Sequence, residues 1–301
     1  MDDSKTLLVD APSLFYRALF SSPDEIRTPG GDPINAAHGF FRMLARLIEI
    51  HDPTHLACAA DENWRPAWRV ELVESYKDFR AAAGSAQEDA EARLASQVPV
   101  IYGFLEMCDI ETLGHPDYEA EDVIGTLAER AAGKVVIFSG DRDLFQLVCD
   151  PKVTVHWPVK GVSNAASVTE AYIAERYGIP GRAYRDFAVL RGDPSDGLPG
   201  VKGVGEKTAA ALVAGYGGIE GIIEALERGE SSSPLAKVRR DLDYVRRALE
   251  VTTIVTDVPL PESELARPVD LPTDEILIAA DRLGIRGPVS DLLAALLKRE
   301  K

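Results

Sequence analysis

A chain of 301 residues can bury a substantial core and divide into one large domain or two. The hydrophobic fraction is 46%, and the sequence shows neither a basic and apolar leader nor an apolar run of about 18 residues. We therefore expect neither export nor membrane insertion, and a cytoplasmic protein is favoured. The formal net charge of −16 argues against a nucleic-acid partner, unless the acids bind cations and the basic residues are clustered.

Apolar runs and helical periodicity alternate along the first half of the chain. Strands are predicted at residues 6–9, 56–60 and 135–138, and helices at residues 14–19, 36–50 and 86–108. This alternation predicts an α/β fold, with a parallel sheet and crossover helices. Ligands of such sheets bind at the carboxyl ends of the strands, where Asp10, Asp61 and Asp141 fall.

Carboxylates gather in three short clusters between residues 118 and 200. Together with Asp10, their members are Glu119, Glu121, Asp122, Asp141, Asp143, Asp193 and Asp196. Like charges raise each other's pKa, so such a group is tolerated mainly when cations neutralise it. An all-oxygen ligand set favours Mg²⁺ or Mn²⁺ over zinc, and pairs of these ions cleave phosphodiesters. The alternative is that these acids are solvated surface charge.

Spacing separates the members of the first cluster. Glu119 and Asp122 are three residues apart and would share one face of a helix, whereas Glu121 would point elsewhere. Asp141 and Asp143 would project to one side of an extended segment.

The chain becomes helical in pattern after about residue 168. Ser167 and Glu170 have the spacing of a capping box at the start of this region. Further on, the glycine-rich segment 200–209 precedes an apolar helix at 210–214, and its backbone N–H groups together with Lys207 would attract an anion. Neither a Walker A loop nor a dinucleotide fingerprint matches, which leaves a clamp on a DNA backbone as the better interpretation.

Basic residues fall in three groups. Their members are Arg65, Arg69, Lys77 and Arg80, then Lys202 and Lys207, and then Lys237, Arg239, Arg240, Arg246 and Arg247. For the third group a solvated helix face is the favoured interpretation. The three cysteines have no C-x-x-C spacing and are expected to be buried free thiols.

The acid clusters within residues 140–147 and 192–200, followed by the clamp at 201–209, resemble the bacterial 5′ nuclease family over about residues 6–256. That family contains flap endonucleases and the 5′ to 3′ exonuclease domain of DNA polymerase I. The resemblance implies a PIN-like 5′ nuclease core with a helical arch (residues 1–167, with the arch at about 69–95). It also implies a helix-three-turn-helix DNA-binding region (168–260), and a C-terminal helical tail follows at 261–301.

The resemblance also carries over roles for individual residues. The metal ligands would be Asp10, Glu119, Glu121, Asp122, Asp141, Asp143, Asp193 and Asp196, with Asp61 as a further acid near them. The DNA-binding positions would be Arg69, Tyr76, Lys77, Arg80, Lys202, Gly203, Gly205, Lys207 and Thr208. The catalytic residues would be Lys77, Arg80, Asp122, Asp141 and Asp143. Glu121 replaces the family's usual Asp, which predicts an altered metal preference.

The implied function is a structure-specific 5′ nuclease, both flap endonuclease and 5′ to 3′ exonuclease, which hydrolyses DNA with two or more Mg²⁺ or Mn²⁺ ions in replication and repair. Potassium at the helix-three-turn-helix, RNA primers, a replication or repair polymerase as partner, and a monomeric state are further expectations. Two alternatives stay open at this point. One is a catalytically weak module that binds branched DNA, and the other is a nuclease that acts mainly on RNA.

Overall fold

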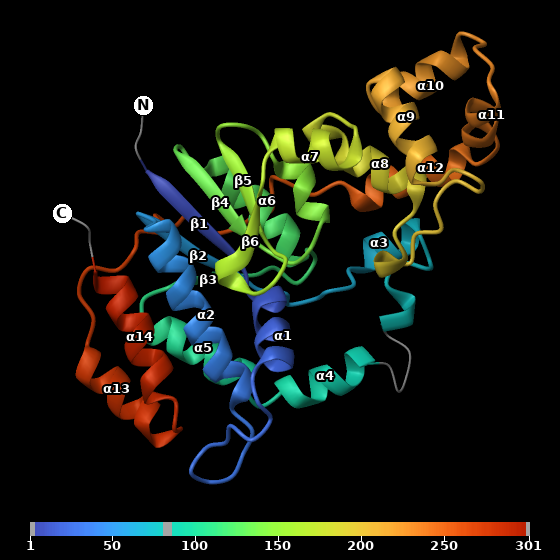
Figure 1. Cartoon of the computed structure of the whole chain (residues 1–301). Helices are drawn as coiled ribbons and strands as arrows, with labels where there is room; N and C mark the ends of the chain where they lie inside the picture. Colours follow the sequence, from blue (N-terminus) through green and yellow to red (C-terminus); the bar gives the residue numbers. More distant parts are fainter. Residues whose placement is uncertain (1–3, 81–85, 299–301) are drawn as a thin grey trace.

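A mixed β-sheet forms the centre of the molecule, and the computed structural model describes it within residues 4–80 and 86–298 (Figure 1). Its strand order is β3-β2-β1-β4-β5-β6. The strands are β1 (Lys5–Asp10), β2 (His55–Ala59), β3 (Glu111–Leu113), β4 (Lys134–Phe138), β5 (Val153–Pro158) and β6 (Ala165–Val168). The predicted strands at 6–9, 56–60 and 135–138 are therefore confirmed as β1, β2 and β4.

The sheet is parallel from β3 to β5, as expected, and its central strands β1 and β2 are apolar and buried on both faces. The sheet departs from the predicted parallel arrangement at one edge, where β6 pairs antiparallel with β5. The two strands are joined directly through η3 (Val162–Asn164), and Gly161 takes a positive φ of 82° in this connection. A short connection of this kind reverses the chain, whereas a parallel partner needs a longer crossover.

Helices cover both faces of the sheet, and each face has its own apolar core. On one face lie α1 (Ala11–Ser21), α2 (Asn35–His51) and α5 (Val98–Met107). α14 (Arg286–Leu297) packs on α2, and α13 (Thr273–Arg282) packs on α14, within the same apolar core. The other face packs against α6 (Ala120–Arg130), η2 (Asp143–Leu147), α7 (Glu170–Tyr177), η4 (Gly181–Ala183) and α8 (Tyr184–Arg191). The carboxyl edge of the sheet stays open between these layers.

The helix predicted over residues 86–108 is interrupted. α4 (Ala86–Leu94) and α5 are separate, and Gln97 lies buried at the break, where its side-chain oxygen accepts a hydrogen bond from the backbone N–H of Ala36 at 2.8 Å. The predicted capping box at Ser167 is also wrong, because Ser167 lies in β6 and Thr169 caps α7. All three cysteines are free, as expected, although Cys149 is only half-buried.

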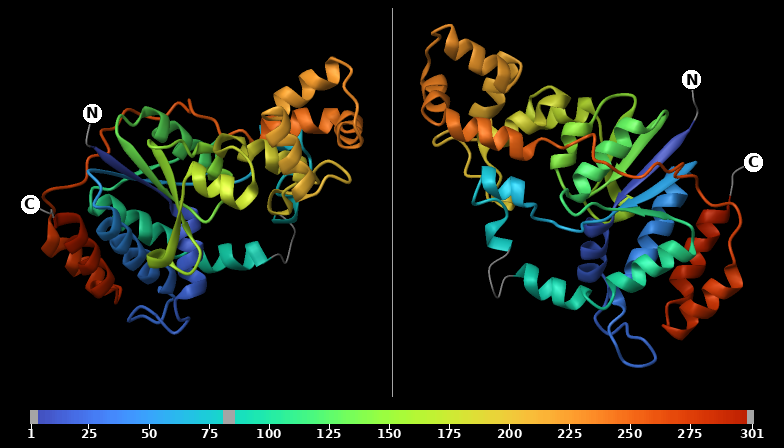
Figure 2. Two further views of the ribbon diagram at one scale, coloured as in Figure 1. Left: turned by 45° about the horizontal axis from the view of Figure 1, so that its top comes forward. Right: turned by 180° about the vertical axis from the view of Figure 1, so that it is seen from behind.

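A second group of helices extends away from the sheet, on the opposite side of the molecule from α13 and α14 (Figure 2). It consists of α9 (Glu206–Tyr216), α10 (Ile219–Glu227), α11 (Ser233–Arg240) and α12 (Leu242–Thr252), which follow η5 (Pro194–Asp196). In the described part of the chain no single helix has the length and apolar character to cross a membrane. The bent pair α9 and α10 passes that test jointly, by length and composition only.

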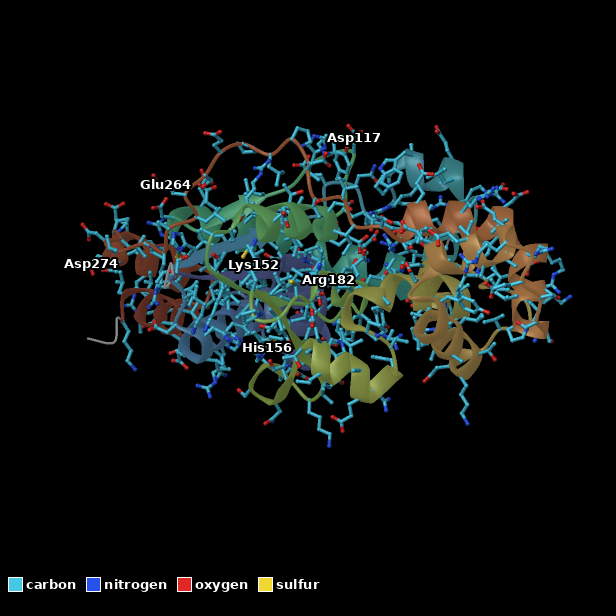
Figure 3. The ribbon with its side chains drawn as sticks, turned by 90° about the horizontal axis from the view of Figure 1, so that it is seen from above. Asp117, Lys152, His156, Arg182, Glu264 and Asp274 are labelled. Carbon is cyan, nitrogen blue, oxygen red and sulfur yellow. The ribbon has the colours of Figure 1, made fainter. Side chains whose placement is uncertain are left out.

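Residues 253–272 return along the molecule to α13. Glu264 on this connection and Asp274 at the start of α13 lie at the end of the molecule remote from α9–α12 (Figure 3). Arg267 anchors the connection, since its buried guanidinium donates to the carbonyl oxygens of Ala295 and Leu296 at the end of α14. Helices do form within the predicted C-terminal tail, but the boundaries at residues 167 and 260 stay predictions.

Candidate active site

A cavity of about 1010 Å³ opens at the carboxyl edge of the sheet. Asp10 ends β1, Asp61 follows β2, and Asp141 follows β4, so neighbouring parallel strands deliver all three to this cavity, as predicted. The other predicted acids on its wall are Glu119, Glu121 and Asp193. Asp122, Asp143 and Asp196 are buried nearby and do not line it.

Asp10 is held on two sides. One carboxylate oxygen accepts a hydrogen bond from the backbone N–H of Ser13 at 3.0 Å and caps α1, and the other accepts one from the hydroxyl of Ser139. Burial, with smaller contributions from the charges of Asp61 and Asp141, outweighs these hydrogen bonds and raises the pKa of Asp10 to about 7. A nearby cation would reverse this effect.

Asp61 and Asp141 have similar surroundings. Burial and the charge of Glu119 raise the pKa of Asp61 to about 6, although Asp61 accepts a 2.6 Å hydrogen bond from the backbone N–H of Ala120. Burial and the charge of Asp196 raise the pKa of Asp141 and that of Asp143 above their usual range. Asp141 also accepts from the N–H of Asp143 at 2.9 Å, which places the two carboxylates at the start of η2.

Arg69 lies at the centre of the first acid cluster. One terminal nitrogen, Nη1, is 3.2 Å from Glu119 and 3.1 Å from Glu121, and the other, Nη2, donates to Asp122 at 2.7 Å. The expectation that Glu121 points away from Glu119 and Asp122 is therefore wrong. Glu119 is the N-cap of α6, with extended backbone, so helical spacing does not apply to it, and all three carboxylates reach one guanidinium.

The burial of Arg69 contradicts the prediction that it contacts DNA. Its side chain in α3 (Ala67–Leu72) is fully buried, and its guanidinium lies 4.8 Å from the ring centre of Trp68. Tyr76, also predicted to contact DNA, is 2% exposed and donates its hydroxyl to Glu119 at 3.0 Å. Both residues support the acid cluster from behind.

Asp122 has its carboxylate oxygens occupied. Besides Arg69, it accepts hydrogen bonds from the backbone N–H of Val255 at 2.9 Å and of Glu119 at 3.1 Å, and the latter completes a capping box at the start of α6. This placement differs from the prediction that Asp122 binds a metal and acts in catalysis. The sequence shows the i, i+3 spacing with Glu119 but not the distant partners that take up the carboxylate.

Lys77 places its ammonium group in the cavity wall, where it donates to Glu119. Its backbone has a positive φ of 50°, which is uncommon for a residue other than glycine, and its N–H donates to the carbonyl of Asp196 at 3.0 Å. Burial lowers the pKa of Lys77, but the charges of Glu119, Asp196 and Glu121 together outweigh burial and raise that pKa above its usual value. Lys77 therefore stays protonated beside the acids.

The loop around η5 supports the segment that carries Lys77. Arg80, in η1 (Asp78–Arg80), donates to the carbonyl of Ser195 at 2.6 Å and lies 3.4 Å from Asp196, and Asp193 pairs with Arg191 at 3.1 Å. Within the described residues, the part of the predicted arch that carries Lys77 and Arg80 therefore packs on the loop around η5. Residues 81–85 of that arch lie outside the described residues.

The donor chemistry of the cavity fits a hard divalent cation. Within residues 4–80 and 86–298, no three His, Cys, Asp or Glu side chains stand close enough together to hold a metal ion directly, and Lys77 and Arg69 occupy oxygens of Glu119. Burial and neighbouring carboxylates nevertheless raise the pKa of Asp10, Asp61 and Asp141, and Lys77 supplies Asp61 and Asp141 with only part of the counter-charge that their ionised forms need. Divalent cations with oxygen ligands would supply it.

The glycine-rich loop before α9 is closed by its own neighbours. Lys237 donates to the carbonyl of Gly203 at 2.8 Å, and Arg240 donates to that of Lys202 at 2.9 Å. Lys202 and Lys207 extend into solvent, and Gly205 is the N-cap of α9. The interpretation of the third basic group as a merely solvated face is therefore wrong for Lys237 and Arg240, because a linear pattern does not show loop contacts.

Several cavity residues were missed by the sequence analysis. α1 presents Ser13, Arg17 and Phe20 to the cavity, at the spacing of one helix face that begins directly after Asp10. Their position directly after Asp10, the acid at the end of a predicted strand, was the feature of the sequence that could have identified them. Ser139 and Arg191 do not line the cavity but contact Asp10 and Asp193, and nothing in the local sequence indicated them.

The cavity lies at the carboxyl ends of the strands, which is where α/β proteins with open parallel sheets bind their ligands. Residues 5–178 match the family model of the 5′-3′ exonuclease N-terminal resolvase-like domain, and residues 179–272 match that of the 5′-3′ exonuclease C-terminal SAM fold. The chain belongs to the 5′-3′ exonuclease family and is a nuclease.

Two relatives match nearly end to end. The 5′-3′ exonuclease of Streptomyces coelicolor is 44% identical over 96% of this chain and 99% of its own length, and that of Mycobacterium tuberculosis is 39% identical over 97% and 98%. DNA polymerase I of Bacillus subtilis is 34% identical over 85% of this chain, which corresponds to 28% of the polymerase.

The fold agrees with solved structures. A complex of the bacteriophage T5 flap endonuclease with DNA and metal ions has a TM-score of 0.69, at 15% identity over 98% of this chain and 100% of that one. Human GEN1 in complex with Holliday junction DNA has a TM-score of 0.60, at 15% identity, and covers 98% of this chain and 72% of that one.

Proposed function

We propose that this protein cleaves DNA at the junction between a duplex and a 5′ single strand, and that it also trims 5′ ends. The observation that carries the proposal is the cavity at the carboxyl edge, where Asp10, Asp61 and Asp141 meet Lys77. The carboxylates suit divalent cations, and the ammonium group suits a phosphate. The phage enzyme of the same fold, named a flap endonuclease, supports this choice of substrate.

We propose that Mg²⁺ or Mn²⁺ binds to the acids on the cavity wall, which are Asp10, Asp61, Glu119, Glu121, Asp141 and Asp193. Such ions, when bound, activate water and stabilise the leaving oxygen of a phosphodiester. Asp143 and Asp196 are buried beside Asp141 and add to the negative potential there. Asp122 and Arg69 act by positioning, since they hold Glu119 and Glu121 at the cavity.

Lys77 and Arg80 are proposed to bind the phosphate that is cleaved. Lys77 is protonated and faces the acids, so it can stabilise negative charge that develops on the phosphate oxygens. Arg80 keeps a partly exposed guanidinium beside Asp196. In the substrate-free protein Glu119 takes the place of the phosphate as acceptor for Lys77.

The loop before α9 is proposed to hold the duplex through its backbone. Lys202 and Lys207 are exposed there, and Gly203, Gly205 and Thr208 surround the start of α9, where N–H groups favour an anion. Potassium at this loop stays a prediction, and Lys237 already donates to the carbonyl of Gly203.

Action on RNA primers, a monomeric state and a polymerase partner are also proposals. The similarity of DNA polymerase I to this chain supports a role beside a polymerase, in replication and repair.

Cleavage of an end-labelled 5′ flap, with Mg²⁺ or Mn²⁺, tests the proposal. We expect a cut near the junction of the flap, shorter products trimmed from the 5′ end of a blunt duplex, and neither product in excess chelator. Asp141→Ala is the control, because it removes an acid from the cavity wall while the loop before α9 is unchanged, so DNA binding should persist. Equal cleavage of flap and single strand, or activity in chelator, would contradict it.

A further inference from the structure

Phe20 is the exposed aromatic residue of α1. Its side chain is 68% exposed, although its neighbours Leu14, Phe15 and Leu19 on the same helix are packed in the core. The ring lines the candidate active-site cavity and is not part of the catalytic machinery proposed above.

The cavity changes character along α1. Asp10 and the other carboxylates lie at the start of α1, whereas Phe20 lies in its last turn. Leu94 at the end of α4 and Val98 at the start of α5 line the same cavity, and α4 packs beside α1 (Figure 1). Ten residues of helix separate Asp10 from Phe20, a rise of about 15 Å. Phe20 is therefore separated by the length of a few nucleotides from any phosphate bound at the carboxylates.

We propose that Phe20 stacks on an unpaired base of the 5′ strand while the phosphodiester to be cut lies at the acids. Apolar and aromatic side chains offer little to a phosphate, whereas every nucleobase has a face that an exposed ring can cover. The contact is independent of sequence and requires a base that is free of its partner strand. This inference rests on the proposed function, and it identifies how the cavity distinguishes a single strand from a duplex.

Matched flap substrates test the proposal. One carries ordinary nucleotides in its unpaired strand, and the other carries abasic tetrahydrofuran residues there, with the same backbone charge. For Phe20→Ala on the ordinary flap, we expect KM to rise about 5-fold to 100-fold, the range typical of losing one stacked base, with little change in kcat. On the abasic flap the variant and the wild type should have the same KM.

Two further variants complete the experiment. Phe20→Trp keeps a stacking surface and should restore KM on the ordinary flap. Ile278→Ala removes a side chain of similar exposure, 54%, from α13 and should leave both substrates unchanged. An equal loss on both flaps, or no loss on either, would overturn the role of Phe20. A wild-type protein that cuts no flap would instead reject the proposed function.

Discussion

At the scale of single residues, Arg69 and Lys77 explain how the folded protein tolerates several carboxylates around one cavity. Arg69 neutralises part of the charge from behind, since it reaches Glu119, Glu121 and Asp122 without access to solvent. Lys77 does so from the cavity side, where its ammonium group donates to Glu119. Only the second cation is placed where it can exchange its carboxylate partner for a phosphate.

Replacement of Lys77 should therefore affect the chemical step. We expect Lys77→Ala to lower the single-turnover cleavage rate on the order of 10²-fold to 10³-fold, because a preorganised donor to the developing charge is lost. DNA affinity should change much less. Lys134→Ala removes an exposed lysine at the start of β4, at the opposite edge of the sheet from the cavity, and is the matched control. Rates within twofold of the wild type would assign Lys77 a purely structural role.

The pKa of Asp10 predicts a pH dependence of stability in metal-free protein. The folded protein holds this proton up to about pH 7, whereas an ordinary aspartic acid releases it near 3.8, so the folded state binds more protons in between. The contribution of Asp10 to the free energy of unfolding therefore falls as the pH rises between these two pKa values. Relative to the wild type, Asp10→Asn should gain on the order of 4 kcal/mol in unfolding free energy between pH 4 and pH 8.

Urea unfolding in chelator at several pH values measures this difference. Asp241→Asn is the control, because the hydrogen bond from Arg240 lowers the pKa of Asp241 to about 2. The stability that Asp241 contributes is fully present above the pKa of the unfolded state, and it is lost only as the pH falls through the pKa of the folded state. Its difference from the wild type should thus stay constant between pH 5 and pH 8. A constant difference for Asp10→Asn as well would refute the assigned shift.

At the scale of elements, α9 and α14 illustrate two uses of a helix end. The N-terminus of α9 leaves Lys202 and Lys207 in solvent beside a loop that Lys237 and Arg240 hold closed. The C-terminus of α14 is instead buried against Arg267, which takes up carbonyl oxygens that the helix cannot pair itself. One end is available to a ligand, and the other fastens the C-terminal helices to the sheet layer.

The loop before α9 can be tested through the salt dependence of duplex binding. Each phosphate contact contributes about −0.9 to the slope of log affinity against log salt. The double variant Lys202→Ala, Lys207→Ala should flatten that slope by roughly two units, without a change in sequence preference. An unchanged slope would mean that the duplex binds elsewhere.

Loss of Arg267 should weaken the attachment of α14. We expect Arg267→Ala to lower the free energy of unfolding by about 2 to 4 kcal/mol, since buried carbonyl oxygens lose their donor. Flap cleavage at a temperature where the variant is folded should be nearly unchanged. Arg286→Ala removes an exposed arginine that contacts Leu277 on the neighbouring helix and should cost much less. Equal unfolding midpoints for the two variants in urea would contradict the anchoring role.

At the scale of the whole molecule, the parallel sheet brings acids from distant parts of the chain to one edge, at an electrostatic cost. A cation that binds only the folded state stabilises it by mass action, by about 2.7 kcal/mol at 100 times its Kd. We therefore expect Mg²⁺ or Mn²⁺ to raise the melting temperature, and Asp141→Ala to reduce that rise. Na⁺ at equal ionic strength controls for screening. The same rise with Na⁺ would argue against divalent sites.

The strands β1, β2 and β4 and the acids at their ends could be predicted from the amino-acid sequence alone, because a buried parallel strand appears in the sequence as a short apolar run. The sequence also indicated the family, through Gly140–Leu147 and the segment 192–209. The tertiary structure decided how these acids are used. Arg69 lies in a separate segment from the cluster that it neutralises, Val255 reaches Asp122 across the fold, and Ser139 meets Asp10 only because β1 and β4 are adjacent. Such contacts join residues far apart in the chain, so no local pattern contains them, and whether a charged side chain faces DNA or the core depends on packing.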